Sequence, residues 1–192
     1  MAELLAGVYS DPNHAITNSF GGLRAIAVRD AKEVVVLGCD DELNWWTLLG
    51  TCEGAETTID FSPKAPKVGA LKATGSETGL TFADGNTWRK IQPAALSFED
   101  DAAPGLQGVY RDNTAGLHFV SSRLGKTERD EVVIVSTDAS LSAFSAQTGG
   151  RFDGTHFTCG GLGDATLTTD GRLVFNDGAW TKLRLKADPH AL

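Results

Sequence analysis

The sequence has no long apolar run, little cysteine and no excess of positive charge. A membrane-spanning helix needs about 20 consecutive apolar residues, and no stretch of this chain approaches that length. The formal net charge is −8, which argues against nucleic acid or an anionic membrane as partner, because both are recognised through basic patches. The acidic charge favours solubility and leaves basic proteins possible as partners.

Targeting and metal-binding patterns are also missing. The first strand is expected almost at once, at residues 5–9, so we expect no signal or transit peptide here. The histidines show no metal-type pairing and are expected at the surface or half-buried; they are His14, His118, His156 and His190. A calcium site can be imagined from Asp11, Asn13 and residues 40–42, but the spacing does not match an EF-hand loop. Turn chemistry explains these residues more simply.

The three cysteines do not form a disulfide framework. Cys39, Cys52 and Cys159 are odd in number and unevenly spaced. We expect reduced thiols packed as small hydrophobic groups, although a bridge between Cys39 and Cys52 is possible.

The sequence does contain an internal repeat. Residues 79–90 hold a short β run, an Asp-Gly turn and a Trp-x-Lys segment, and residues 171–182 repeat all three. Asp-Gly between such runs predicts a β-hairpin, because a tight hairpin turn requires residues that tolerate positive φ. Gly-Val-Tyr at 7–9 returns at 108–110, and the β-branched run 33–37 returns at 131–135. The fixed order predicts a duplicated structural module.

Short β runs fill both copies. In the first copy we predict strands at 5–9, 23–29, 34–39, 44–50, 57–61, 70–74, 79–82 and from 88 onward. In the second copy we predict them at 106–110, 117–122, 131–137, 141–146, 155–159, 165–169, 173–175 and 179–185. Many short strands separated by Gly and Asp turns are typical of a barrel or a sandwich.

The fold class is therefore all-β. We predict two tandem homologous antiparallel β modules, of barrel or sandwich type, with a pseudo-twofold relation. The first module spans 1–91 and the second 106–185. Residues 92–105 form a linker with one turn of helix at most, and 186–192 form a loose tail. One lipocalin-like barrel built by both repeats stays open as an alternative.

No catalytic or cofactor motif appears. The glycine-rich stretch 160–163 opens no helix and lies in no βαβ unit, so it does not predict a phosphate loop. No serine stands in a Gly-x-Ser-x-Gly elbow. We predict a protein that is not an enzyme and has no cofactor.

The tryptophans are candidates for core and contact positions. Trp88 and Trp180 occupy the same place in both copies, which predicts core packing. Alignment by residues 34–37 sets Trp46 against Phe144 and Trp45 against Ala143. Trp46 is then expected inside its module and Trp45 outside, as a platform for ligand stacking or a protein interface. Cover from a loop or from the other repeat is the alternative for Trp45.

A proline-rich loop is present in one repeat only. Two prolines within four residues exclude a central strand at 62–67. We predict that Trp45 and this loop, through Pro63, Lys64 and Pro66, make the contacts of the protein with a partner or a ligand.

Three segments carry a resemblance to a known family. Residues 7–14, 59–64 and 82–90 resemble a tandem β module of chlorophyll c algae, and the chain is similar to the diatom pyrenoid shell proteins. The second repeat departs from this pattern, because it has Thr-Cys-Gly-Gly at 158–161 in place of Asp-Phe-Ser-Pro-Lys. The resemblance implies a plastid protein of the pyrenoid, with a structural role and no cofactor. The partners that the resemblance implies are copies of the protein itself and, as further candidates, Rubisco or other pyrenoid proteins.

Two functions from different classes remain. The first is a non-enzymatic structural protein that assembles into a sheet or shell, since exposed strand edges and two similar faces permit open assemblies. The second is a small-ligand or glycan-binding β module with Trp45 as its stacking platform, or a lipocalin-like carrier.

Overall fold

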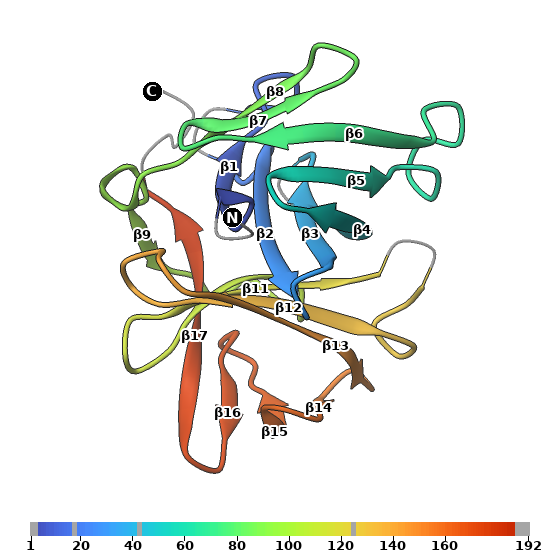
Figure 1. Cartoon of the computed structure of the whole chain (residues 1–192). Coiled ribbons are helices and arrows are strands. Elements are labelled where there is room, and N and C mark those ends of the chain that lie inside the picture. Colours follow the sequence, from blue (N-terminus) through green and yellow to red (C-terminus); the bar gives the residue numbers. More distant parts are fainter. Residues whose placement is uncertain (1–3, 17–18, 42–43, 124–125, 187–192) are drawn as a thin grey trace.

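Two closed β-barrels follow one another along the chain (Figure 1). The computed structural model describes residues 4–16, 19–41, 44–123 and 126–186. In barrel one each strand pairs antiparallel with the next, and β8 closes onto β1 through the pairs Tyr9–Lys90 and Ser10–Arg89. Its strands are β1 (Gly7–Ser10), β2 (Leu23–Arg29), β3 (Glu33–Cys39), β4 (Trp45–Glu53), β5 (Glu56–Asp60), β6 (Ala70–Gly75), β7 (Gly79–Phe82) and β8 (Thr87–Lys90).

Barrel two repeats this order and closes between β10 and β17. Its strands are β10 (Gly108–Arg111), β11 (Leu117–Ser122), β12 (Val132–Thr137), β13 (Phe144–Phe152), β14 (His156–Cys159), β15 (Gly163–Leu167), β16 (Leu173–Phe175) and β17 (Gly178–Leu185). The all-β prediction with two repeated modules is confirmed, and each module is a barrel. The alternative of one barrel shared by both repeats is wrong.

Tyr9 and Tyr110, the repeated tyrosines, each form a hydrogen bond with the segment that precedes the first strand of their barrel. The Tyr9 hydroxyl donates to the Leu5 carbonyl at 2.8 Å, and the Tyr110 hydroxyl donates to the Leu106 carbonyl at 2.7 Å. Both rings are fully buried, and burial raises the pKa of both phenols. The Gly-Val-Tyr motif therefore ties the entry segment of each repeat to its own core.

The glycine of that motif makes room for the lysine of Trp-x-Lys. A Cβ on Gly7 would lie 2.6 Å from Lys90 Cε, and one on Gly108 would lie 2.8 Å from Lys182 Cε. Each ammonium then lies 5.9 Å from the centre of the repeated tyrosine ring. The two sequence motifs are thus one packing unit that joins the first and last strands.

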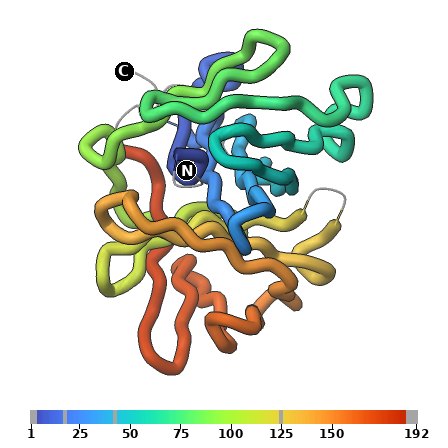
Figure 2. Tube along the Cα trace, viewed as in Figure 1, coloured from blue at the N-terminus to red at the C-terminus, as the bar shows by residue number. Residues whose placement is uncertain are grey.

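The two barrels join through the outer faces of equivalent strands. Strand β2 packs on β12 and β13, and its counterpart β11 packs on β3 and β4. This reciprocal contact is the pattern of a twofold relation, and Figure 2 shows the two barrels stacked across it. One apolar cluster fills the junction: Val8, Phe20, Leu23, Ala25, Ala27, Val35, Leu37, Cys39, Trp45 and Ile91 from repeat one, and Val109, Leu117, Phe119, Val133, Val135, Leu183 and Leu185 from repeat two.

The connection between the barrels is more ordered than predicted. It contains a short 3-10 helix, η2 (Pro93–Ala95), and a strand, β9 (Phe98–Asp100). Strand β9 pairs with β17, where Leu183 lies between Val109 of β10 and Asp100 of β9. The prediction of a linker without a strand is wrong, because β17 extends beyond β16 and offers β9 a free edge.

Beyond β17 the described chain ends at Lys186, whose N–H donates to the Ser97 carbonyl at 2.8 Å. The rest of the predicted tail lies outside the described residues. Within the described parts of the chain, no helix is long and apolar enough to cross a membrane.

Candidate functional site

The two barrels differ most at one pair of equivalent ends. In each repeat this end carries the turns that follow the first, third, fifth and seventh strands. The turn after the fifth strand is long in repeat one, where residues 61–69 form what we call the plug loop. In repeat two only residues 160–162 separate β14 from β15.

A buried arginine organises this end of barrel one. Arg24 is 1% exposed. Its Nη2 lies 3.0 Å from Asp11 Oδ2 and 2.9 Å from Asp40 Oδ1. Its guanidinium carbon lies 4.9 Å from the ring centre of Trp46 and 5.5 Å from that of Trp88. The cation is therefore held by two carboxylates and two aromatic faces.

The plug loop closes the barrel above this arginine. Lys64 forms an ion pair with Asp40, and its Nζ lies 4.3 Å from the ring centre of Trp46. Burial opposes ionisation of Asp40, but Lys64 and Arg24 outweigh it and lower the pKa of that carboxyl. Phe61 packs edge-on against Trp88, with ring centres 6.3 Å apart. Loop and barrel wall together fill the opening.

The residues once considered for calcium serve other roles. Asp11 and Asp40 do come together, but around the Arg24 guanidinium. The Asn13 side chain donates to Asn86 Oδ1 at 2.9 Å, in the β7–β8 hairpin. Glu42 lies outside the described residues. Among the residues described, no group of three or more His, Cys, Asp and Glu could hold a metal ion.

In barrel two a histidine takes the place of the arginine. His118 pairs with Tyr110 in the β ladder as Arg24 pairs with Tyr9. Its ring lies 3.6 Å from that of Trp180, with only 3° between the planes. Burial lowers the pKa of His118, and Asp112 partly offsets this. The prediction of surface or half-buried histidines is wrong here, since His118 is 7% exposed.

Hydrogen bonds link His118 to a serine and an aspartate. Nδ1 lies 2.8 Å from Ser136 Oγ, and Nε2 lies 3.0 Å from Asp112 Oδ2. An ionised carboxylate only accepts, so Nε2–H donates to Asp112 and Nδ1 accepts from Ser136.

Serine, histidine and aspartate in one chain are the groups of a hydrolase triad. Repeat one favours a structural role for these groups. Arg24 and Asp11 occupy the positions equivalent to His118 and Asp112, and they form an ion pair there without a nucleophile. We assign this set to cross-linking the barrel end. The other histidines agree with the prediction in part: His14 and His156 are exposed, and His190 lies outside the described residues.

The end of barrel two is less filled than that of barrel one. Trp46 pairs with Gly38 in the first barrel, and Ser145 pairs with Ser136 in the second. Trp46 therefore corresponds to Ser145. Because Ser145 is small and exposed, the tryptophan that fills barrel one has no counterpart of similar size in barrel two.

The same register corrects the alignment made from the sequence. Trp45 pairs with Cys39 as Phe144 pairs with Thr137, so Trp45 corresponds to Phe144 and not to Ala143. The alignment was wrong by one residue because the turn after β12 is one residue longer than the turn after β3. The prediction that Trp46 lies inside its module and Trp45 outside still holds.

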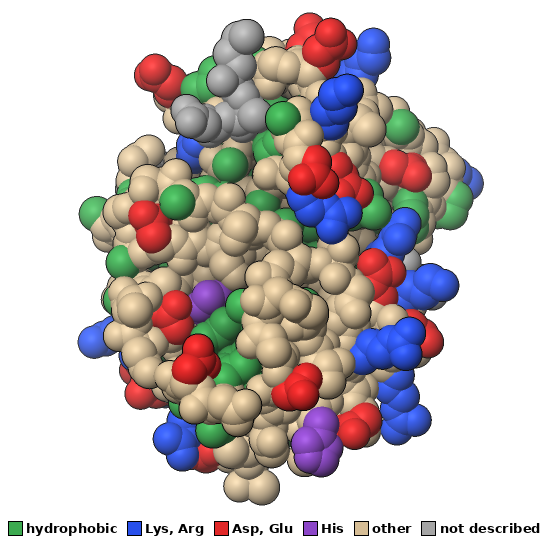
Figure 3. Space-filling model, turned by 60° about the horizontal axis from the view of Figure 1, so that its bottom comes forward, with side chains coloured by type: hydrophobic (Ala, Val, Ile, Leu, Met, Phe, Trp, Pro, Cys, Tyr) green, Lys and Arg blue, Asp and Glu red, His purple; other side chains and the backbone are tan. Residues whose placement is uncertain are grey.

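A cavity of about 220 Å³ opens at this end of barrel two, and we call it the recess. Its apolar lining comes from Leu162, Phe175 and Trp180, and its acidic lining from Asp112 and Asp177. In the lower half of Figure 3, hydrophobic side chains form the floor of a hollow with acidic side chains at its rim. The volume lies below the roughly 300–1,000 Å³ of drug-sized pockets, so the recess suits one side chain or a small ligand.

The predicted contact residues are separated by the structure. Trp45 is 7% exposed and packs against Phe20, with ring centres 5.3 Å apart. Its use as an exposed platform is wrong, because the other repeat covers it. Lys64 points inward to Asp40, whereas Pro63 and Pro66 are exposed.

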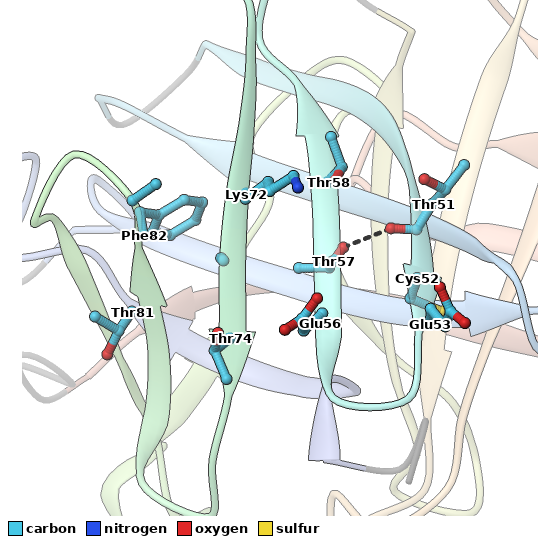
Figure 4. Close-up of a pocket in the computed structure, with 12 residues that line it drawn as sticks. Thr51, Cys52, Glu53, Glu56, Thr57, Thr58, Lys72, Thr74, Thr81 and Phe82 are labelled. Atoms are coloured by element: carbon cyan, nitrogen blue, oxygen red, sulfur yellow. Dashed lines mark hydrogen bonds between the residues drawn. The ribbon is translucent and has the colours of Figure 1, made fainter.

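A larger hollow of about 630 Å³ lies over strands β4 to β7 of barrel one (Figure 4). Its exposed lining is threonine, glutamate and lysine with Ala83, and its one aromatic residue, Phe82, is buried. The Thr57 hydroxyl is bound to the Thr51 carbonyl at 3.0 Å. The hollow is a broad polar sheet surface without converging reactive groups, so we place the candidate site at the recess.

No cysteine lines the recess, whereas Cys52 belongs to the lining of the larger hollow. All three are free thiols, and Cys39 and Cys159 are buried. The possible bridge between Cys39 and Cys52 is absent.

Comparison with known proteins adds no relative: no protein-family model, curated protein or solved structure matches the chain.

Proposed function

We propose that this protein is a non-enzymatic structural protein that assembles with copies of itself into an extended sheet- or shell-like array. The observation that carries the proposal is the pseudo-twofold union of two barrels. This union buries the apolar outer faces of both repeats. It leaves exposed the two equivalent barrel ends, one with the plug loop and one with the recess, which differ in shape. A body with related but unequal ends can join neighbours without closing a ring.

The resemblance to the diatom pyrenoid shell proteins supports the same function. On that basis the array would lie in a plastid, around a Rubisco-rich pyrenoid, with Rubisco or another pyrenoid protein as a further partner. No cofactor is needed for such a role.

The test is the mass of the protein in solution by light scattering, with negative-stain microscopy of the same sample over a range of salt and protein concentrations. We expect large species that appear as sheets, tubes or ladders. A monomer under every condition would overturn the proposal.

A second candidate function is small-ligand binding in the recess, favoured by its aromatic and acidic lining. Trp180 would report binding of a glycan or another small ligand through its fluorescence. Gly178 lines the recess, and a Leu at this position fills it. Asn86→Leu, at the equivalent position of barrel one, is the matched control. Binding that survives Gly178→Leu would exclude the recess.

A further inference from the structure

Repeat one shows which chemistry this barrel end accepts. Its opening is occupied by a lysine ammonium, held by the Asp40 carboxylate and the face of Trp46. The lysine is delivered by the plug loop of the same chain. A carboxylate beside an aromatic ring is a favourable site for an ammonium group.

Repeat two has neither the lysine nor a counterpart of Trp46, but its opening is again acidic and aromatic, through residues at other positions. The recess has Asp112 and Asp177 beside Phe175 and Trp180. None of the residues that line it carries a positive charge, and His118 behind Asp112 is held in its neutral form by burial. The recess is therefore an unbalanced acidic opening with an aromatic floor.

The plug loop presents a second lysine to solvent. Lys64 is used inside barrel one, but Lys67 is exposed, and Val68 beside it is 46% exposed. Val68 is one of only three large hydrophobic residues exposed in the described chain. The outer side of the loop thus combines exposed apolar surface with one exposed cation, which forms no ion pair among the residues that the structure describes.

The plug loop is also held by hydrogen bonds of its own backbone. The Phe61 N–H donates to the Gly69 carbonyl at 2.9 Å, and the Val68 N–H donates to the Ala65 carbonyl at 2.8 Å. The ion pair of Lys64 ties the loop to the barrel. A preorganised loop loses little conformational entropy on binding.

Loop and recess lie on different sides of the molecule. In Figure 1 the plug loop, between β5 and β6, is at the right, and the turn between β10 and β11 is at the left. That turn carries Asp112 and borders the recess. A contact between one loop and another molecule's recess is therefore head-to-tail.

We infer that the recess of barrel two receives the plug loop of a second copy of this chain, with Lys67 against Asp112 and Asp177 and Val68 against the aromatic floor. This inference rests on the proposed self-assembly and names one pair of surfaces that contributes to it. Because the contact joins two different surfaces, each copy can bind one neighbour at either end, and this contact alone gives an open row of copies.

Charge reversal tests the contact. Lys67→Glu and Asp177→Lys should each raise the concentration needed for assembly about tenfold or more, since like charges then meet. The double variant Lys67→Glu/Asp177→Lys restores opposite charges and should recover most of the assembly. Lys72→Glu and Glu77→Lys, exposed positions of barrel one outside the loop, are the matched controls and should assemble normally.

Mixing of two blocked variants tests the head-to-tail geometry. Lys67→Glu has a defective loop and an intact recess, and Gly178→Leu has a filled recess and an intact loop. At a protein concentration at which the wild type assembles, each alone should stay monomeric in sedimentation velocity, and an equal mixture should stop at pairs. Folding of each variant is checked by its thermal unfolding curve.

The outcomes separate the two proposals. Wild-type protein that assembles, together with charge-reversed variants that assemble equally well, overturns the loop–recess contact and leaves self-assembly standing. A wild-type monomer under all conditions overturns both. Loss of assembly in both single variants, with recovery in the double variant, supports both.

Discussion

At the scale of single residues, Arg24 and His118 show how one position is used in two chemically different ways. Both sit at the same register of the second strand of their repeat, and each is bound by the aspartate that follows the first strand. The arginine also binds Asp40, whereas the histidine binds Ser136 and stacks on Trp180. In both repeats the side chain supplies a hydrogen-bond donor to a carboxylate that is buried, as in Asp11, or partly buried, as in Asp112.

Replacement of Arg24 by Met should destabilise the protein strongly. The substitution leaves Asp11 with its carboxylate buried and its cation removed. Breaking a buried ion pair from one side costs about 3–5 kcal/mol, which urea unfolding will measure. Arg172→Met removes an exposed pair with Asp170 and should cost less than about 1 kcal/mol. Equal effects of the two variants would contradict this role of Arg24.

His118 should make stability depend on pH. Its pKa in the folded protein is lowered from 6.5, mainly by burial, so the unfolded chain binds the proton more readily. The stability that it contributes is present above pH 6.5 and is lost as the pH falls through the folded pKa. In urea unfolding from pH 7.5 down to pH 5, the wild type should lose more stability than His118→Gln. His156→Gln, at an exposed position, is the control, and parallel curves for wild type and His118→Gln would contradict the assignment.

At the scale of elements, the pairing of β3 with β4 explains why the barrel ends differ. A Cβ on Gly38 would lie 2.3 Å from the Trp46 ring, so the tryptophan fills barrel one only because its cross-strand partner is glycine. The corresponding pair in barrel two is Ser136 and Ser145. This exchange, together with the absent plug loop, leaves the end of barrel two less filled than that of barrel one.

The Gly38–Trp46 pair can be tested by adding one methyl group. Gly38→Ala forces the Trp46 ring to move in a packed core and should cost about 1–3 kcal/mol. Ser136→Ala at the equivalent position adds no volume and removes one hydrogen bond to His118, at about 1 kcal/mol. Thermal unfolding should therefore rank Gly38→Ala as the less stable variant, and the opposite order would show that the contact is relaxed without strain.

At the scale of the whole molecule, the barrel junction makes one body of two modules. Its cluster draws buried apolar side chains from β1 to β4 of one repeat and from β10, β11, β12 and β17 of the other. Strands β2 and β3 are therefore buried on both faces, one toward their own barrel and one toward the partner barrel. We expect a single unfolding transition for the two barrels.

Trp45→Ala should therefore act on stability. The side chain lies in the junction, and loss of a large aromatic group from a core costs about 3–5 kcal/mol. Urea unfolding should show this loss, and folded protein should assemble as before. Val174→Ala, at an exposed position, should change stability by less than about 0.5 kcal/mol. Weaker assembly of fully folded Trp45→Ala would contradict the internal position.

The sequence by itself determined the duplication, the positions of most strands along the chain and the all-β class. Hairpin turns, the alternation of apolar residues and the Gly-Val-Tyr and Trp-x-Lys motifs are local signals, and they were repeated in the same order. The strands 23–29, 117–122 and 173–175 were predicted with their observed bounds. Local chemistry suffices there, because each strand is marked by its own residues and by the turns beside it.

Only the tertiary structure decided which faces of the barrels are covered. Strand alternation predicts that the Trp45 side chain points out of its own barrel. Its burial depends on the second barrel, about 90 residues away in the sequence. The strand β9 needs the free edge of β17, and the Arg24 cluster needs three loops to converge. The recess exists because the turn after β10, Leu162 of the short β14–β15 turn and the Trp180 hairpin meet at one barrel end. Such features arise from long-range contacts, which no local pattern of residues encodes.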